Sequence, residues 1–302
     1  MEDHPPFKSG FIGIIGRPNV GKSTLLNAIL GERLAITTPK PQTTRNRIMG
    51  IHTTGQGQFI FLDTPGIHRG DNPLSRSMVS AARETFRSAD ILLLLVEAPR
   101  IDRNDREIIA SLAELSLPVI LGINKIDKIR KPLLLPLIDE ARTLYPFREI
   151  VPMSARSGDG VNVLLEEILK LLPEGPPLFP EDTLTDRPER FIAAEIVREK
   201  IILSTRQEIP YASAVTVDTF REESGRRLIR IQATIHVEKE SQKAILIGRK
   251  GAMLKEIGTR AREEMERFFD SRIFLELFVR VQKDWTRDPR ALREFGYVEE
   301  DG

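Results

Sequence analysis

Hydrophobic residues in the first half of the chain gather in short β-type runs, several of them continuously apolar, separated by stretches with helical spacing. The runs cover residues 11–15, 59–62, 91–96, 119–123 and 150–152. A strand that is covered on both faces is apolar along its whole length, and strands that alternate with helices form right-handed βαβ units. The pattern therefore predicts an α/β domain with a mostly parallel sheet and helices on both faces. Ligands of such domains bind at the carboxyl ends of the strands.

The second half of the chain has a different pattern. Residues 229–238 alternate between apolar and polar side chains, which is typical of a strand with one buried face. The other predicted elements are helices at 189–205, 241–247 and 252–269, strands at 211–220 and 273–281, and a turn at 223–225. This order, α-β-β-α-α-β, predicts a compact α+β domain.

A segment with five prolines, residues 173–188, separates the two patterns. Proline has no amide hydrogen and a fixed φ, so this segment is neither a helix nor a central strand. We therefore predict a first domain over residues 1–172, a linker over 173–188 and a second domain over 189–302.

Composition excludes several classes of site. The chain has 302 residues, which suits two domains, and no cysteine, so disulfides, thiolate zinc sites and cysteine nucleophiles are ruled out. No apolar run approaches the roughly 18 residues that a membrane span needs. The net charge is only +1, so any case for a nucleic-acid partner must rest on local charge.

The first candidate site follows the first predicted strand and matches the pattern G-x-x-x-x-G-K-[ST]. It consists of Gly16, Arg17, Pro18, Asn19, Val20, Gly21, Lys22 and Ser23, and Thr24 comes next. Glycines let backbone amides approach phosphate oxygens, and the helix that begins near Lys22 directs its N-terminus at the anion. We expect Lys22 to reach the β- and γ-phosphates and the Ser23 hydroxyl to bind Mg²⁺. The pattern predicts a P-loop.

The sequence Asn124-Lys125-Ile126-Asp127 follows a later strand and indicates which base is bound. The Asp127 carboxylate can accept two hydrogen bonds from guanine, whereas adenine offers no such donor pair, and a site built on matched donors rejects an unmatched ligand. Lys125 can lie over the ring and Asn124 can brace the loop. Ser154 and Ala155 suit a backbone contact to the guanine oxygen. GTP and GDP are therefore the expected nucleotides.

Two segments are candidates for switches that respond to the γ-phosphate. In Asp63-Thr64-Pro65-Gly66, we expect Asp63 to hold Mg²⁺ through water and the Gly66 amide to contact the γ-phosphate. The other switch is expected between residues 33 and 50. It offers Thr44 and its rival Thr43 as Mg²⁺ ligands, and we prefer Thr44. An ordinary surface loop is the alternative for this second segment.

The second domain carries a G-x-x-G loop between two predicted helices, Gly248-Arg249-Lys250-Gly251. Such a loop lets a nucleic-acid backbone approach closely. From residue 239 to 262 there are seven Lys or Arg and two Glu, so the local charge is +5 although the chain is nearly neutral. We expect RNA contacts from Ile247, Gly248, Arg249, Lys250, Gly251, Lys243 and Lys255.

These motifs resemble the translation-factor-related GTPases. Segments 181–200, 274–285 and 292–297 extend the likeness, and the whole chain is similar to the bacterial Era family, in which a G domain precedes a type II KH domain. The resemblance implies Mg²⁺-dependent GTP hydrolysis, binding to the 3′ end of 16S rRNA, and a role in assembly of the small (30S) ribosomal subunit that is linked to cell growth. It also implies a cytoplasmic location with peripheral contact to the inner membrane, although we find no basic amphipathic anchor. We expect a monomer, and we expect Trp285 to pack on the KH sheet.

The catalytic groups differ from those of Ras-like GTPases. Ile67 stands where those proteins carry the glutamine that positions water. The remaining candidates are Lys22, the Gly66 amide and Mg²⁺. In resembling proteins the asparagine that matches Asn19 helps to bind a potassium ion beside the phosphates. The alternative is that Asn19 only closes its own turn, and the sequence favours neither.

Two other kinds of function compete with this reading. One is a metabolic P-loop kinase, and the guanine motif at 124–127 speaks against it. The other is a passive RNA-binding module with a vestigial nucleotide site. The presence of Lys22, Ser23, Asp63 and Asp127 argues against that.

Overall fold

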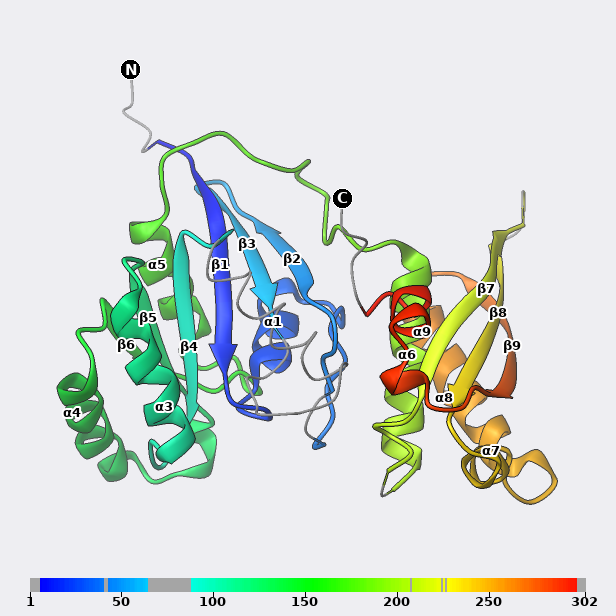
Figure 1. Ribbon diagram of the computed structural model, residues 1–302. Helices are drawn as coiled ribbons and strands as arrows, with labels where there is room; N and C mark the ends of the chain where they lie inside the picture. Colours follow the sequence, from blue (N-terminus) through cyan, green and yellow to red (C-terminus); the bar gives the residue numbers. More distant parts are fainter. Residues whose placement is uncertain are drawn as a thin grey trace. The chain divides into compact units, whose positions relative to one another are not determined.

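The computed structural model describes residues 6–40, 43–64, 88–206, 208–223, 225 and 227–297. By their contacts the described residues form two compact units (Figure 1). The first unit reaches from the N-terminal strand to Asp186 but leaves out residues 36–43. The described residues of this range, 36–40 and 43, group with the second unit, which begins again at Arg187. None of the described helices is long and apolar enough to cross a bilayer.

The first unit is built on a six-stranded sheet with the order β2-β3-β1-β4-β5-β6. Its strands are β1 (Lys8–Gly16), β2 (Ile48–Thr53), β3 (Gly57–Asp63), β4 (Ile91–Glu97), β5 (Val119–Asn124) and β6 (Glu149–Pro152). All neighbours are parallel except β2, which runs antiparallel to β3 at the edge. The predicted, mostly parallel sheet is therefore confirmed. Because β1 lies between β3 and β4, the loop that follows β1 has the ends of both strands beside it.

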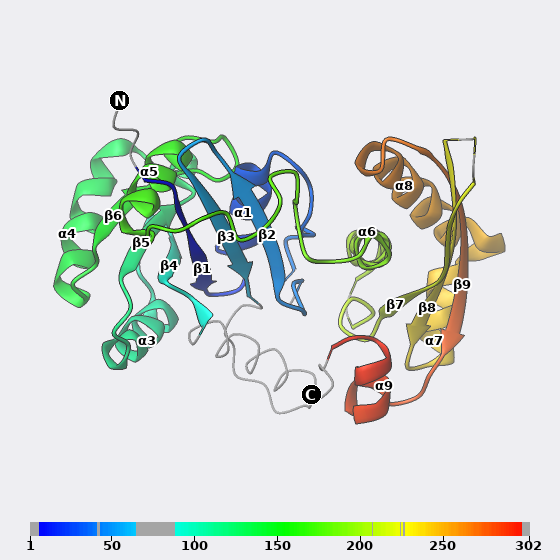
Figure 2. The same ribbon diagram turned by 90° about the horizontal axis from the view of Figure 1, so that it is seen from above.

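Helices cover both faces of this sheet, as the continuous apolar runs require. They are α1 (Lys22–Leu30), α3 (Arg103–Ser111), α4 (Leu134–Leu144) and α5 (Val161–Leu171), with short 3₁₀ turns η1 (Leu112–Glu114), η2 (Ile126–Lys128) and η3 (Lys131–Leu133). Helices α1 and α5 contact each other on one face, and α3 and α4 contact each other on the other (Figure 2). The strand side chains between them, such as Leu92 and Leu94, are fully buried.

The edge strand β2 corrects one expectation. We placed a switch loop over residues 33–50, but residues 48–50 belong to β2 and pair with β3. The strand was not predicted because Gly50 lies within it, and glycine is rare in strands. The structure gives a reason for it: a Cβ at Gly50 would lie 2.6 Å from Cδ1 of Leu26 in α1.

The proline-rich segment connects the two units, and most of it is fastened to the first. The Ser9 amide donates to the Pro173 carbonyl (3.1 Å), and the Ile51 amide donates to the Leu184 carbonyl (2.9 Å). The side chain of Gln58, fully buried in β3, donates to the Phe179 carbonyl and accepts from the Phe179 amide. The segment therefore follows the sheet up to the division between Asp186 and Arg187.

The second unit has a three-stranded sheet in the order β7-β8-β9. Its elements are α6 (Glu189–Ser204), β7 (Ala214–Glu222), β8 (Leu228–Val237), α7 (Glu240–Ile247), η4 (Arg249–Gly251), α8 (Ala252–Phe268), β9 (Arg272–Val281), η5 (Trp285–Arg287) and α9 (Pro289–Glu294). Strand β8 runs antiparallel to β7 and parallel to β9. The predicted α-β-β-α-α-β order is confirmed. The apolar side chains of β8 are buried, and Ile231, Ala233 and Ile235 have no exposed surface.

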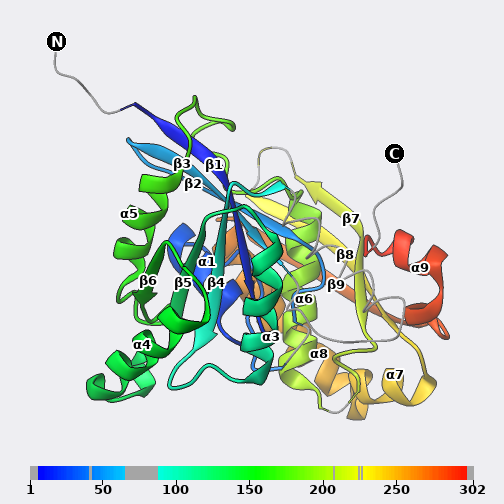
Figure 3. The ribbon, with the colours of Figure 1, turned by 60° about the vertical axis from the view of Figure 1, so that its left-hand side comes forward.

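The C-terminal segment packs back onto this unit through aromatic side chains, and Figure 3 shows α9 beyond the end of β9. Trp285 is fully buried, and its indole Nε1 donates to the Ala212 carbonyl (3.1 Å). Its ring lies against the rings of Phe295 and Tyr297. The expectation that Trp285 packs rather than contacts a ligand is confirmed.

Candidate functional site

The predicted phosphate loop lies between β1 and α1, at the carboxyl end of the central strand. Gly16 has a φ of 145°, and a Cβ there would lie 2.5 Å from the Leu95 carbonyl oxygen. Gly21 has a φ of 107°, and a Cβ there would lie 2.2 Å from Nδ2 of Asn124. Both the positive φ angles and the closeness of neighbouring atoms therefore exclude a side chain at these two positions. Asn19 is left-handed as well, with a φ of 64°.

Residues from later strands hold the loop from outside. Nδ2 of Asn124 donates to the Val20 carbonyl (2.8 Å), and Nζ of Lys125 donates to the Asn19 carbonyl (2.7 Å). The Asn124 Oδ1 accepts from the Ala155 amide (2.9 Å). Asn124, which is buried, thus joins the phosphate loop to the segment that follows β6. The bracing role predicted for Asn124 agrees with these contacts.

The rest of the predicted guanine site lies around this asparagine. Ser154 and Ala155 are buried directly after β6, and Asp127 is exposed in η2. Lys125 adopts a left-handed φ of 65° and pairs with Glu97 (2.7 Å) at the end of β4. The structure therefore gathers the predicted base-recognition residues at the carboxyl ends of neighbouring strands, with the Asp127 carboxylate open to a ligand.

Lys22 lies inside the phosphate loop. Its Nζ donates to the carbonyls of Gly16 (3.0 Å) and Arg17 (2.9 Å), and the residue is only 6% exposed. Burial lowers the pKa of Lys22 to about 8, although the Asp63 carboxylate acts in the opposite direction. A bound anion would stabilise the protonated form of this buried lysine, because an opposite charge offsets the cost of desolvation.

Ser23 and Asp63 form a cluster of oxygen atoms beside Lys22. The Ser23 hydroxyl donates to Oδ2 of Asp63 (2.7 Å) and lies 3.0 Å from the Thr44 hydroxyl. Burial raises the pKa of Asp63 to about 6, partly offset by Lys22. Oδ1 of Asp63 is buried and has no hydrogen-bond partner among the described residues. Hydroxyl and carboxylate oxygens are the ligands that Mg²⁺ prefers, so the cluster fits that ion.

Thr43 and Thr44 point to different partners. The Thr43 hydroxyl donates to the Lys40 carbonyl (2.7 Å) and lies 2.6 Å from the Thr38 hydroxyl, whereas the Thr44 hydroxyl faces Ser23. The geometry therefore favours Thr44 as the threonine of the Mg²⁺ site. Thr64 donates its hydroxyl to the Ile14 carbonyl (2.8 Å). Pro65, Gly66 and Ile67 lie outside the described residues.

Sequence reasoning missed the partners of Arg17. Its guanidinium contacts Asp105 through Nε and Asp102 through Nη1, both at 2.7 Å. Asp102 and Asp105 also cap the N-terminus of α3 by exchanging hydrogen bonds with each other's backbone. The spacing D-x-x-D signals this cap in the sequence. No pattern in the sequence pairs the cap with a residue 88 positions earlier.

In the second unit the G-x-x-G loop has the expected form. Gly248 has a φ of 71°, and a Cβ there would lie 2.8 Å from Cβ of Met253. Lys250 and Gly251 are also left-handed, with φ values of 51° and 79°. Arg249 and Lys250 are exposed at the turn, and Lys255 is exposed one turn into α8. Ile247 and Lys243 are half-buried on α7.

A groove begins at this loop and runs between α8 and the edge strand β9. It has a volume of about 400 Å³ and is lined by Gly251, Leu254, Lys255, Gly258, Thr259, Arg262, Leu275 and Leu277. Its lining combines apolar side chains, Leu254, Leu275 and Leu277, with the basic Lys255 and Arg262. An edge strand also offers unpaired backbone groups. Such a groove suits unstacked bases whose phosphates lie along the glycine loop.

Comparison with known proteins places both units in families. Residues 11–125 match the family described as 50S ribosome-binding GTPase, and residues 208–286 match the KH domain family. GTPase Era of Syntrophus aciditrophicus is 65% identical over 294 residues, which cover 97% of this chain and 96% of the relative. GTPase Era of Geobacter metallireducens is 56% identical over 299 residues, with 99% and 100% coverage.

Two solved structures agree with these relatives. One is a variant of Aquifex aeolicus Era bound to GDP and AlF4⁻, and the other is Era in complex with MgGDPNP and nucleotides 1506–1542 of 16S ribosomal RNA. Each is 45% identical to this chain, covers 97% of it and 100% of the solved chain, and has a TM-score of 0.93. The similarity covers nearly the whole chain and therefore both units, and the chain belongs to the Era family of GTPases.

Proposed function

We propose that this GTPase is a GTP-controlled RNA-binding switch that acts on the 3′ end of 16S rRNA during assembly of the small ribosomal subunit in the cytoplasm. One observation carries the proposal. A relative that matches nearly the whole chain at 45% identity was solved with MgGDPNP and nucleotides 1506–1542 of 16S rRNA together. The candidate phosphate loop and the G-x-x-G groove supply one site for each of those ligands.

For the nucleotide, we assign the loop amides of residues 16–24 and the Lys22 ammonium to the phosphates. Asp127 recognises guanine, Lys125 lies along the base, and the backbone at Ser154 and Ala155 contacts the guanine oxygen. Support comes from the buried, partly desolvated Lys22 and from the hydrogen bonds that join Asn124 to Val20 and Ala155.

Ser23, Thr44 and Asp63 would hold Mg²⁺. Bound Mg²⁺ supplies positive charge that neutralises the phosphoryl oxygens as charge develops on them. The chain's own residues then position the phosphates, because the loop amides and Lys22 are fixed before the nucleotide arrives. The Asp63 carboxylate, with one buried oxygen that lacks a partner among the described residues, supports this assignment.

Asn19 is our candidate for a potassium site beside the phosphates. Its left-handed backbone is held through a hydrogen bond from Lys125 to its carbonyl. We expect faster GTP hydrolysis in KCl than in NaCl, and we expect Asn19→Ala to remove the difference. Equal rates for the unaltered protein in the two salts would refute the potassium site and leave the Mg²⁺ assignment intact.

For RNA, we assign the backbone phosphates to Arg249, Lys250 and the glycine loop, with Lys243 and Lys255 adding charge. The bases enter the groove between α8 and β9. Phosphate contacts supply affinity and base contacts supply sequence preference.

The proposal is tested by measuring GTP hydrolysis and binding of the 16S fragment 1506–1542 by the full chain. Lys22→Ala should abolish hydrolysis and Lys250→Ala should weaken RNA binding, while the exposed Lys131→Ala should change neither. If the unaltered protein bound ATP as tightly as GTP, the nucleotide assignment would be wrong. If its GTP and GDP forms bound the fragment equally, it would not be a switch.

A further inference from the structure

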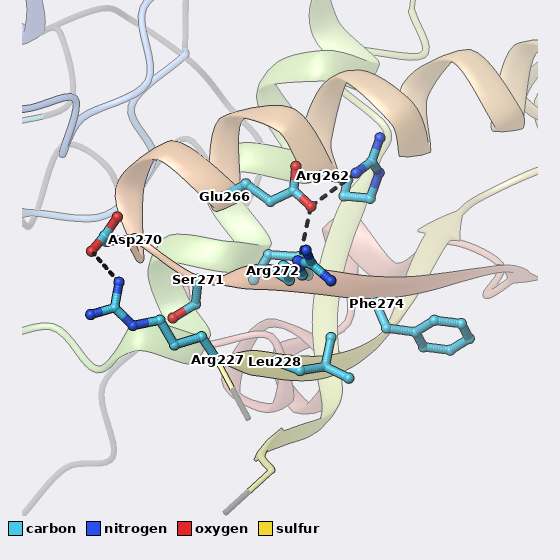
Figure 4. A pocket seen from close by; sticks show the side chains of 9 residues that line it. Arg227, Leu228, Arg262, Glu266, Asp270, Ser271, Arg272 and Phe274 are labelled. Atoms are coloured by element: carbon cyan, nitrogen blue, oxygen red, sulfur yellow. Dashed lines mark hydrogen bonds and ion pairs between the residues drawn. The ribbon is translucent and has the colours of Figure 1, made fainter. Parts of the chain in front are cut away.

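Two kinds of ion pair occur in the KH unit, and they differ in burial. The first kind lines an open hollow of about 710 Å³ at the end of α8 (Figure 4). There the Asp270 carboxylate lies 3.6 Å from the Arg227 guanidinium, and the two side chains are 95% and 84% exposed. An exposed pair of this kind contributes little to stability. The second kind lies on α6 and is almost completely buried.

Helix α6 carries four charged side chains that are each at most 8% exposed: Glu195, Arg198, Glu199 and Lys200. The Arg198 guanidinium donates from Nε and Nη2 to the two carboxylate oxygens of Glu195, at 2.6 Å each. Lys200 pairs with Glu199 and, at 3.5 Å, with Glu264 of α8. Burial of charge is costly, and apolar residues of similar volume are often at least as stabilising. Stability alone therefore does not account for these charges.

One face of α6 holds the segment that comes before Thr44. Nη2 of Arg198 donates to the Thr43 carbonyl (2.5 Å) as well as to its carboxylate partner. Oε1 of Glu199 accepts a hydrogen bond from the Thr37 amide (3.2 Å). Both contacts are made to backbone atoms of the segment, so they fix the course of the chain rather than the rotamer of one side chain.

Arg198 makes the contact nearest to the proposed Mg²⁺ site. It holds the carbonyl of Thr43, and the next residue is Thr44, the threonine of that site. Lys40 is also attached to α6, but it comes earlier in the segment. Because the planar guanidinium is bound by both oxygens of Glu195, few other orientations are open to it. The contact therefore limits the positions that Thr44 can take.

We propose that Arg198 is a positioning residue for the nucleotide site, which holds Thr44 where its hydroxyl can bind the Mg²⁺ of a bound triphosphate. Switch segments of GTPases are ordered by contacts to Mg²⁺ and the γ-phosphate and are released when that phosphate is lost. Helix α6 supplies part of this order before the triphosphate binds, and preorganisation of this kind raises affinity. The gain applies to GTP and not to GDP. The inference rests on the proposed role of Thr44 in binding Mg²⁺.

The test is a double-mutant cycle on the full chain. Titrations measure the affinities for Mg·GDPNP and for GDP of the unaltered protein, Arg198→Lys, Thr44→Ala and the variant with both changes. Lysine keeps the charge beside Glu195 but offers one nitrogen in place of the fork of donors. Arg227→Ala, which alters the exposed pair, is the matched control. Thermal unfolding confirms that each variant is folded.

A second variant serves if Arg198→Lys does not fold. It combines Arg198→Met with Glu195→Gln, so that neither residue leaves an unpaired charge buried on α6. The same titrations apply to it.

We expect Arg198→Lys to weaken Mg·GDPNP binding roughly three- to tenfold, the size of effect that loss of one hydrogen bond produces. Its affinity for GDP should be unchanged. Because Arg198 acts through Thr44, the variant with both changes should bind GDPNP no more weakly than Thr44→Ala alone. Arg227→Ala should bind both nucleotides like the unaltered protein.

Three results would overturn the role of Arg198. Its variant could bind both nucleotides like the unaltered protein, or it could lose affinity for GDP and GDPNP equally, which would indicate a purely structural role. Its loss of affinity could also add in full to that of Thr44→Ala. Full affinity of Thr44→Ala for GDPNP would instead refute the Mg²⁺ assignment in the proposed function. The two kinds of failure are therefore distinguishable.

Discussion

At the scale of single residues, burial brings the pKa values of two neighbouring groups toward neutrality. The pKa of Asp63 is raised to about 6 and the pKa of Lys22 is lowered to about 8. For each group, desolvation by burial is the largest cause of the shift. Binding of a phosphate with Mg²⁺ requires the carboxylate to be ionised and the lysine to be protonated. Between these two pKa values both conditions hold in the nucleotide-free protein.

The affinity for Mg·GDPNP should therefore be greatest between about pH 6 and 8. Below pH 6 protonation of Asp63 must be reversed before Mg²⁺ binds, so the affinity should fall by up to tenfold per pH unit. Above pH 8 the loss of the Lys22 proton should lower it in the same way. Titration calorimetry across this range measures both limbs. The variant Asp63→Asn should lose the acid limb, and a flat profile for the unaltered protein would contradict the assignment.

A second residue-scale prediction concerns Gly21. The change Gly21→Ala places a methyl group 2.2 Å from Nδ2 of Asn124 at a φ of 107°, so the loop must move and GTP affinity should fall at least tenfold. Gly31→Ala is the matched control. Its φ is also positive, at 72°, but nothing lies within 4 Å of the new methyl group. It should cost about 1–2 kcal/mol of stability and leave affinity unchanged. Equal affinities for both variants would argue against the close packing of Gly21.

At the scale of elements, α3 supports the phosphate loop through its own N-terminal cap. Asp105 has no exposed surface and accepts from the Asp102 amide as well as from Arg17. The Asp105 carboxylate thus caps the N-terminus of α3 and also holds the side chain of Arg17 in the phosphate loop. The carbonyl of that loop residue, Arg17, also accepts a hydrogen bond from Lys22.

We expect Asp105→Asn to loosen the phosphate loop. It removes the charge that pairs with Arg17, so GTP affinity should fall roughly three- to tenfold and stability by about 1–3 kcal/mol. Glu107→Gln alters an exposed pair with Arg103 on the same helix and should change neither quantity appreciably. Nucleotide titration and chemical unfolding of both variants provide the measurements. A loss of stability without any loss of affinity would mean that Asp105 serves the helix alone.

At the scale of the whole molecule, the segment before Thr44 belongs to the second unit, while Thr44 itself belongs to the first. Lys40 donates from Nζ to the carbonyls of Ile202 (2.6 Å) and Thr205 at the end of α6. The Thr37 amide donates to Oε1 of Glu199 (3.2 Å). Thr44, a residue of the proposed Mg²⁺ site, is therefore the first residue after a segment that belongs to the KH unit.

This connection predicts a coupling between the two ligands. RNA should tighten GDPNP binding by the same factor by which GDPNP tightens RNA binding, because linkage is reciprocal. Lys40→Ala should bring this factor close to one and leave the affinity for each ligand alone nearly unchanged. Lys131→Ala is the control. The measurement is a pair of titrations with and without the second ligand, and an unchanged factor in Lys40→Ala would place the coupling elsewhere.

Elements and motifs whose chemistry is local can be predicted from the order of the amino acids. Continuous apolar runs identified the parallel strands of the first unit, and alternation identified β8, because burial on two faces or on one dictates each pattern. The phosphate loop and the G-x-x-G turn were visible because positive φ and close approach demand glycine at fixed spacing.

Contacts between residues far apart in the chain became known from the fold. It revealed β2, where Gly50 makes room for Leu26, and it attached the proline-rich segment to the first sheet. It favoured Thr44 over Thr43 through a contact with Ser23, and it paired Arg17 with Asp105. Spacing along the chain determines which residues share a strand or a turn, whereas these partners meet only because the sheet brings separate loops to one edge.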